Sequence, residues 1–167
     1  GKRLDKGIVF LENAYRILKD NGRMGIVLSN SIASIDSHKQ ARKWLLEKMR
    51  IVAIFDLPPK VFGETGVNTS VIIAYKAKEK ELKKLNESNY QVFFKAIKNV
   101  GYEIRERKSV KFFDPIYRIN YNTFETEIDK NTGGNLLNED FSETIQDFKE
   151  WCKGQEKSLQ DLFIKKK

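Results

Sequence analysis

The chain has 167 residues, of which 40% are hydrophobic and 32% are charged, and its formal net charge is +8. These values are typical of one globular domain with or without an appendage, and they favour a polyanionic partner such as nucleic acid, although a lysine-rich surface alone would give the same charge. The sequence shows neither a secretory signal nor an apolar run near the ~20 residues of a membrane helix, so we expect a cytoplasmic protein that does not contact a membrane.

Helical and strand-like patterns alternate in the first part of the chain. Apolar residues recur at helical spacing over 8–19, and the helix should end at Asn21-Gly22. Ser37 followed by Gln40 has the pattern of a capping box, which predicts a second helix that begins at Ser37. Three short apolar runs have the composition of buried strands, and they cover 24–28, 51–57 and 71–75.

The order of these elements predicts a fold class. A helix, a strand, a second helix and a second strand in alternation are typical of parallel α/β units. The glycine-bearing loop over 61–68 is too short for a helical crossover, so the third strand should run antiparallel to the second. The sequence therefore predicts an α/β domain over residues 1–77 that forms one edge of a doubly wound sheet.

The rest of the chain has a different composition. Residues 78–89 are highly charged and lack β-branched side chains, which predicts an exposed helix or a linker. Residues 90–153 are predicted to form a β-rich extension followed by a C-terminal helix, which should end at Gly154. Residues 154–167 end in three lysines and are predicted to be a flexible basic tail.

Few side chains in this sequence suggest chemistry by themselves. Asp56 follows the second predicted strand, where open α/β sheets bind ligands, but a turn residue bonded to nearby backbone N–H groups is the favoured interpretation. The single cysteine, Cys152, and the single histidine, His38, exclude an internal disulfide, a cysteine-rich zinc site and a catalytic pair of histidines. The segment over 63–66 is too short for a phosphate-binding loop. We expect no metal site.

Four ordered segments carry a resemblance to a known family. They are FLENAYRILKDNGRMGIVLSNSI from Phe10, ARKWLLEKMRIVAIFDLPPKVF from Ala41, TGVNTSVIIAYK from Thr65 and VFFKAIKNVGYEIRER from Val92. No segment is specific alone, but together they resemble the N6-adenine DNA methyltransferases, especially the modification subunits of type I restriction systems. The resemblance covers roughly residues 7–107, and the family's common Gly-Tyr-Asp is replaced here by Gly101-Tyr102-Glu103.

The resemblance implies the C-terminal half of a Rossmann-like sheet that binds S-adenosylmethionine in an intact parent protein. Family members bind this cofactor on a glycine-rich turn and position adenine with an Asn/Asp-Pro-Pro-Tyr/Phe motif. Neither motif occurs here. The one Pro-Pro pair, Pro58-Pro59, is flanked by Leu57 and Lys60 and so lacks the amide and the aromatic side chain of the second motif. We therefore expect no catalytic and no cofactor-binding residue in this chain, and neither activity nor cofactor binding by the chain alone. We also expect a natural reading frame that extends upstream of Gly1.

One family position can be assigned to this sequence. In the family, an aromatic residue in the hairpin before the last strands stacks on the adenine that is flipped out of the duplex, and Phe62 is the best match. A stacking face partly replaces the base stacking that the flipped adenine loses. The alternative is that Phe62 is a hydrophobic plug that anchors its loop.

The resemblance also implies partners, which are DNA and the specificity and restriction subunits of a type I system. The possible DNA contacts are Lys60, Asn68, Arg105, Arg107, Lys108 and Lys111. Two alternatives remain open from the sequence. The chain could be a basic nucleic-acid-binding or subunit-docking module without catalysis, because aromatic residues are interleaved with Arg105, Arg107, Lys108 and Lys111. It could also be a structural domain whose portion over 86–153 contacts a partner subunit.

Overall fold

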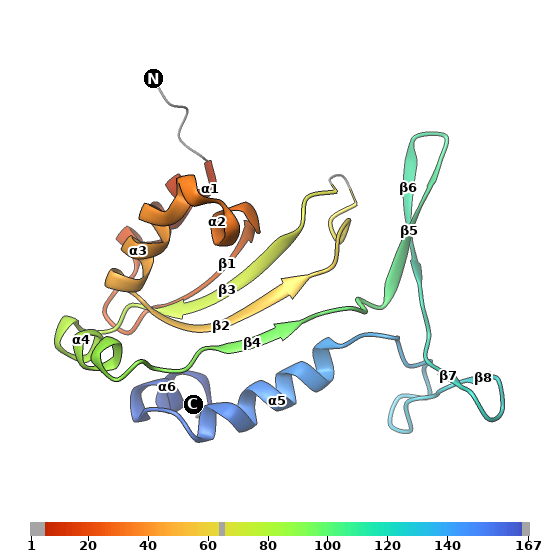
Figure 1. The fold of residues 1–167 in the computed structure, drawn as a ribbon. Helices are drawn as coiled ribbons and strands as arrows, with labels where there is room; N and C mark the ends of the chain where they lie inside the picture. The colour runs from red at the N-terminus through yellow and green to blue at the C-terminus, as the bar shows by residue number, and fades with distance from the viewer. Residues whose placement is uncertain (1–5, 64–65, 165–167) are drawn as a thin grey trace.

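A four-stranded sheet has helices on both faces, and a β-rich extension projects from one end of it (Figure 1). The computed structural model describes residues 6–63 and 66–164. The first elements in chain order are α1 (Lys6–Ile17), β1 (Arg23–Ser29), α2 (Ser31–Ser34), η1 (Asp36–His38), α3 (Lys39–Lys48), β2 (Arg50–Leu57) and β3 (Thr69–Tyr75). They are followed by α4 (Glu79–Glu87), β4 (Phe93–Ala96), β5 (Tyr102–Arg107), β6 (Val110–Pro115), β7 (Ile119–Asn120), β8 (Glu125–Thr126), α5 (Phe141–Lys153) and α6 (Lys157–Phe163).

The strand order of the main sheet is β1-β3-β2-β4. β3 lies between β1 and β2 and runs antiparallel to both, which confirms the orientation predicted for the second and third strands. β1 and β2 consequently run in the same direction. β4 pairs with β2 in parallel, so residues 93–96 extend the main sheet, although the sequence assigns them to the β-rich extension. The fold is therefore mixed α/β.

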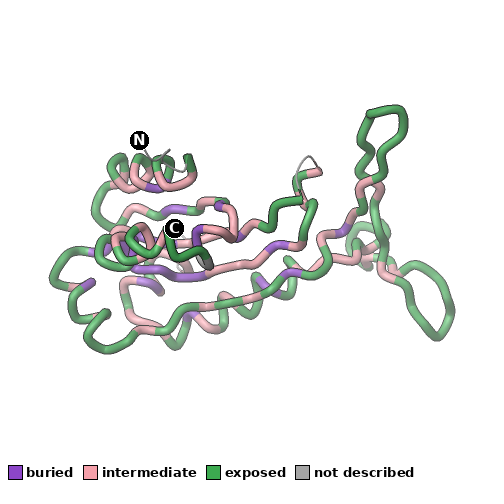
Figure 2. Tube along the Cα trace, turned by 45° about the horizontal axis from the view of Figure 1, so that its top comes forward, coloured by how far each residue is buried: buried purple, intermediate pink, exposed green. Residues whose placement is uncertain are grey.

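Each face of the sheet packs against its own group of helices. On one face, the buried side chains Leu11 of α1 and Leu45 of α3 pack against sheet residues such as Ala74. On the other face, Leu159 of α6 and Cys152 of α5 pack with Tyr75. Neighbouring residues of β3 thus enter different cores, because successive side chains of a strand point to opposite faces. Figure 2 shows that buried residues gather along these strands.

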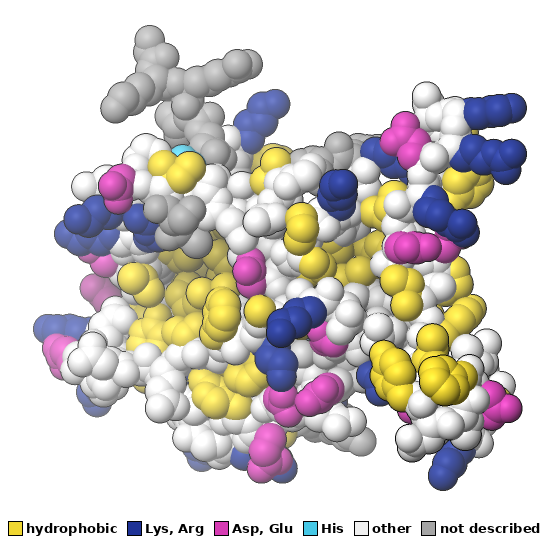
Figure 3. Space-filling view, turned by 45° about the vertical axis from the view of Figure 1, so that its right-hand side comes forward, with side chains coloured by type: hydrophobic (Ala, Val, Ile, Leu, Met, Phe, Trp, Pro, Cys, Tyr) yellow, Lys and Arg dark blue, Asp and Glu magenta, His cyan; other side chains and the backbone are white. Residues whose placement is uncertain are grey.

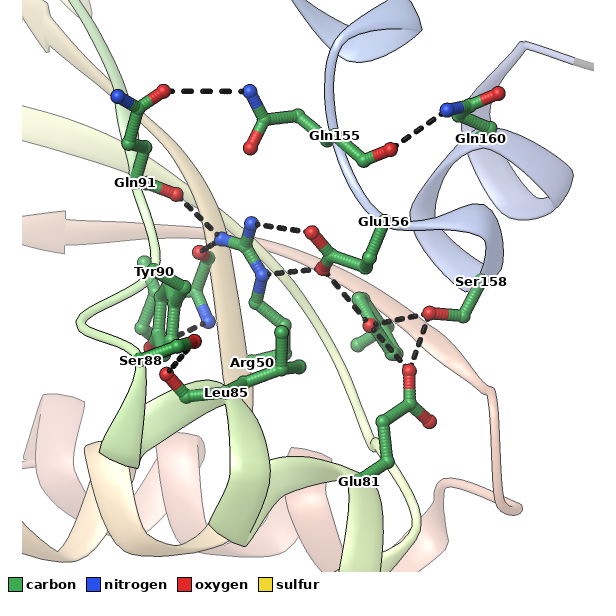
Figure 4. A network of polar contacts seen from close by, with 12 residues as sticks. Arg50, Glu81, Leu85, Ser88, Tyr90, Gln91, Gln155, Glu156, Ser158 and Gln160 are labelled. Carbon is green, nitrogen blue, oxygen red and sulfur yellow. Dashed lines mark hydrogen bonds and ion pairs between the residues drawn. The ribbon is translucent and has the colours of Figure 1, made fainter.

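A buried arginine joins the sheet to the C-terminal helices (Figure 4). Arg50 of β2 is fully buried, and its guanidinium donates to the two carboxylate oxygens of Glu156 at 2.7 and 3.1 Å. It also donates to the carbonyl of Gln91 at 2.9 Å and lies 4.2 Å from the ring centroid of Tyr90. Burial alone would raise the pKa of Glu156, but hydrogen bonds and charge from Arg50 hold it below its ordinary value.

The C-terminal segment differs from its prediction. A flexible tail was expected over 154–167, but residues 157–163 form α6, and Leu159 is fully buried against the sheet. Apolar burial and the Arg50–Glu156 ion pair explain why this segment is ordered. Gly154 ends α5 as predicted. The terminal lysines at 165–167 lie outside the described residues.

The start of the second long helix also differs from its prediction. Ser37 lies inside the 3-10 helix η1, and α3 begins only at Lys39. No side-chain hydrogen bond caps α3 at His38, so the predicted capping box is wrong. The chain makes an extra turn, α2, before η1. Ser37 thus lies two residues before the start of α3, inside a 3-10 turn, and does not serve as its cap.

The extension contains two small β-hairpins and no core. β5 pairs with β6, and β7 pairs with β8, as the β-rich prediction for this region implies. The structure describes every residue over 102–140, and none of them is buried. Asp140 joins the extension to the sheet, because its carboxylate accepts from the backbone N–H groups of Lys98 and Asn99 at 2.7 and 2.9 Å.

Candidate nucleic-acid interface

Three polar side chains meet at one end of the sheet. Asp56 near the end of β2 accepts a hydrogen bond from the Asn30 amide at 2.7 Å and another from the Ser70 hydroxyl at 3.2 Å. The Ser70 hydroxyl also lies 2.5 Å from the Asn30 side-chain oxygen. The sequence suggested backbone N–H partners for Asp56, but its partners here are side chains from β3 and from the residue after β1. This cluster fixes the strand ends from which the next loop departs.

Phe62 lies in a tight turn just after β2. The Gly63 N–H donates to the Lys60 carbonyl at 2.8 Å, and both residues have left-handed backbones, with φ of 64° at Lys60 and 74° at Gly63. The Phe62 side chain is 50% exposed. A ring exposed to this degree contributes little to a core, which weakens the alternative of a hydrophobic plug.

The β5–β6 hairpin supports this turn from the side. The Tyr102 hydroxyl donates to the Val61 carbonyl at 2.6 Å, and the Lys111 ammonium donates to the Gly63 carbonyl. A Cβ atom added at Gly63 would lie 3.2 Å from the Phe113 ring and 3.4 Å from Ile104. Contacts to both neighbours of Phe62 therefore fix the backbone while the ring itself stays accessible. Sequence reasoning missed Tyr102, although it belongs to the Gly-Tyr-Glu motif.

The predicted DNA contacts fall into two groups. Lys60 lies two residues before Phe62, Asn68 lies at the end of the same loop just before β3, and both are exposed. The other four lie on the β5–β6 hairpin, whose basic side chains project at the upper right of Figure 3. They are not equivalent, because Arg105 pairs with Asp114 and Lys111 bonds to the Phe62 turn. Arg107 and Lys108 are exposed at the hairpin tip.

Other chemistries find little support in the described residues. Within 6–63 and 66–164, no group of three or more His, Cys, Asp or Glu side chains could hold a metal ion. Burial raises the pKa of the Cys152 thiol to about 11, so it stays protonated at neutral pH and is a poor nucleophile. In the same part of the chain, no helix is long and apolar enough to span a membrane.

The turn after β1 lacks the features of a site for S-adenosylmethionine. The turn after β1 is Ser29-Asn30-Ser31, and its polar groups are engaged with each other and with Asp56 and Ser70. No glycine lies in this turn, so the backbone provides no open cradle of the kind that nucleotide-like cofactors occupy. S-adenosylmethionine therefore does not fit this turn.

Comparison with known proteins gives a family and two structural similarities. The N-6 DNA methylase family matches residues 3–158. One solved structure concerns the structural basis of complex assembly and conformational transition of the type I R-M system. It shares 25% identity, with a TM-score of 0.39, over 41% of this chain and 15% of that chain. The modification subunit of a putative type I restriction enzyme from Vibrio vulnificus YJ016 shares 14% identity, with a TM-score of 0.40, over 78% of this chain and 30% of that chain.

Proposed function

The chain belongs to the N-6 DNA methylase family, and from this premise we propose that it is the DNA-facing part of an adenine-specific methyltransferase, in the modification subunit of a type I restriction-modification system. In this proposal, residues 1–77 are the C-terminal part of a Rossmann-like sheet, 78–89 connect it to the extension, and 90–153 are the extension and its helix. S-adenosylmethionine and the catalytic motif belong to the rest of the parent protein. The chain alone is inactive.

The observation that carries this proposal is the supported Phe62 turn. Adenine must leave the duplex before its amino group can be methylated, and an aromatic face partly replaces the stacking that it loses. Phe62 has the exposure for this role, and the contacts from Tyr102 and Lys111 support its turn. A preformed stacking face costs less conformational entropy when the base arrives.

Basic side chains supply the second part of the proposed interface. Lys60 lies in the Phe62 turn, and Arg107 and Lys108 extend from the hairpin that supports it. Lys111 connects these two groups. Contacts from lysine and arginine to phosphates position a duplex without reading its sequence. The hairpin therefore positions the duplex while Phe62 receives the flipped base.

Substitution of Phe62 in the intact parent tests the proposal. We expect Phe62→Ala to lower the methyl-transfer rate on the order of 10- to 100-fold, because base–aromatic stacking contributes about 1–3 kcal/mol. Phe62→Trp should retain most activity, and cofactor affinity should not change for either variant. The measurements are single-turnover transfer rates, cofactor titration and thermal stability on the same preparations.

Phe124→Ala is the matched control, because this ring is 81% exposed on a different part of the molecule. Its transfer rate per assembled complex should equal that of the wild type. A lower melting temperature for Phe62→Ala with an unchanged rate per folded molecule would show that Phe62 anchors its loop and does not stack on the base.

A further inference from the structure

The part of the extension around β7 and β8 exposes an unusual set of apolar side chains. We call residues 116–139 the acidic lobe. The structure describes the whole lobe, and none of its side chains is buried. Tyr121 and Phe124 at its tip are 83% and 81% exposed. Five further large apolar side chains of the lobe are at least 37% exposed, and they are Ile116, Tyr117, Ile119, Ile128 and Leu137.

The backbone beneath these side chains is closed by its own hydrogen bonds. The Arg118 N–H donates to Leu136, Leu136 donates to Glu127, and Glu127 donates back to Arg118, at 2.8 to 2.9 Å. At the tip, the Phe124 N–H donates to the Asn120 carbonyl at 2.7 Å. The tip side chains are thus presented on an ordered backbone, and exposed apolar side chains in such a setting mark interaction sites.

Phe124 also has a backbone conformation that its residue type disfavours. Its φ is 60°, in the left-handed region that glycine and asparagine adopt far more readily. The ring makes no compensating burial, since it is 81% exposed. A strained, exposed aromatic residue is costly for the isolated fold, and such outliers gather at functional sites.

The charge of the lobe decides which partner fits it. The lobe contains four acidic residues, Glu125, Glu127, Asp129 and Glu139, against two basic ones, Arg118 and Lys130, which gives a net charge of 2 − 4 = −2. The whole chain carries +8, so the remainder carries +10. A surface of this sign repels phosphates, and it attracts a protein surface that carries lysine or arginine. Figure 3 shows hydrophobic side chains and acidic groups together on this lobe at the lower right.

We propose that the acidic lobe docks onto a second polypeptide, by inserting Tyr121 and Phe124 into an apolar pocket bordered by basic residues. Aromatic side chains at the centre of an interface commonly carry much of its binding energy, and a charged rim favours the correct partner. Building on the proposed function, this polypeptide is the specificity subunit of the same restriction-modification system. The Phe62 turn and the lobe then face different partners.

The test compares subunit assembly for variants of the intact modification subunit. The affinity for the purified specificity subunit is measured by titration, at low and at moderate salt. We expect the double variant Tyr121→Ser/Phe124→Ser to weaken binding on the order of tenfold or more. Glu125→Lys/Glu127→Lys should also weaken binding, with the larger loss at low salt. Phe62→Ser is the matched control and should bind normally.

Phe124→Gly separates docking from a structural role. Glycine relieves the positive φ and removes the ring, so the docking role predicts weaker assembly with an unchanged or higher melting temperature. A lower melting temperature with normal assembly would overturn the proposal. Unchanged assembly of all lobe variants would also overturn it, and so would a loss of DNA affinity in place of subunit affinity.

The occupant is checked by hydroxyl-radical footprinting of Tyr121 and Phe124. We expect oxidation of both rings in the free intact subunit and protection after the specificity subunit is added. Protection already present in the free subunit would mean that the parent's own chain covers the lobe, which also overturns the proposal. If wild-type modification subunit does not bind the specificity subunit at all, the type I assignment of the proposed function fails first.

Discussion

The sheet and the extension of this chain are stabilised in different ways. The sheet has two apolar cores, and it buries even a charged side chain, Arg50, which is paired with Glu156. The extension over 102–140 has no buried side chain, and backbone hydrogen bonds within its hairpins and bridges hold it together. Figure 2 shows this contrast along the Cα trace.

This difference explains where a functional surface can lie. A side chain that is buried in a core cannot also contact a partner, so the main role of the sheet is to position the loops and the extension that it carries. The extension buries none of its side chains over 102–140, and exposed groups such as Phe124 and Arg107 remain available for recognition. The Phe62 turn joins the two regions, because it departs from β2 of the sheet and is supported by Tyr102 of the extension. Substitutions should therefore have large effects on stability in the sheet and small ones in the extension.

The largest effect is expected at the buried ion pair. Arg50→Met should destabilise the chain by about 3–5 kcal/mol, because it leaves the Glu156 carboxylate without its partner in a partly buried position. Urea denaturation monitored by circular dichroism measures the change. The double variant Arg50→Met/Glu156→Leu should recover much of the loss, since no buried charge remains unpaired.

A surface ion pair provides the control for this comparison. Arg16 and Glu12 are paired on α1, with side chains that are 70% and 46% exposed. Exposed pairs contribute little, so Arg16→Met should leave the urea midpoint almost unchanged. Equal losses of unfolding free energy for Arg50→Met and Arg16→Met would contradict the prediction that the buried pair stabilises the chain more than the exposed pair does.

A smaller and more local effect is expected at the junction of the two regions. Gly63→Ala should cost roughly 1–2 kcal/mol, because φ at this position is 74° and a Cβ would lie 3.2 Å from the Phe113 ring. Hydrogen exchange at the Gly63 amide, which bonds to Lys60, should become faster. Gly66→Ala is the control, since no atom lies within 4 Å of a Cβ there, and similar losses for both substitutions would refute the steric argument.

The sequence predicts the sheet better than the extension, for a physical reason. Apolar residues at helical spacing identify α1, and continuous apolar runs identify β1, β2 and β3, because burial selects both patterns. The same signal is absent where nothing is buried, so the hairpins over 102–139 can be predicted only as β-rich. α6 is also missed, because it is ordered by distant contacts such as Arg50 with Glu156, which are separated by 106 positions.

The candidate site shows the same division. Phe62 can be proposed from its motif, and the basic residues can be proposed from composition. The cluster of Asn30, Asp56 and Ser70 cannot, because three separate segments meet only after the strands have paired. Support of the Phe62 turn by Tyr102 likewise depends on contact between residues 41 positions apart.

The smallest effect is expected at the tip of the β5–β6 hairpin. Binding of this chain to duplex DNA should be weak, unspecific and sensitive to salt, because its excess positive charge releases counterions from the phosphates. Fluorescence anisotropy with a labelled duplex of arbitrary sequence gives the dependence of the affinity on salt. Arg107→Gln and Lys108→Gln should each reduce the slope of log affinity against log salt by about one, with no loss of thermal stability.

Arg105→Gln is the informative comparison on the same hairpin. Hydrogen bonding and the charge of Asp114 raise the pKa of Arg105 and engage its guanidinium within the hairpin. A phosphate can recruit this side chain only in competition with Asp114, so the slope should fall by clearly less than for Arg107 or Lys108. Equal reductions for all three arginine and lysine substitutions would mean that net charge alone governs binding. No reduction for Arg107 and Lys108 would place the DNA on another face, because these exposed basic residues at the hairpin tip would then lie outside the interface.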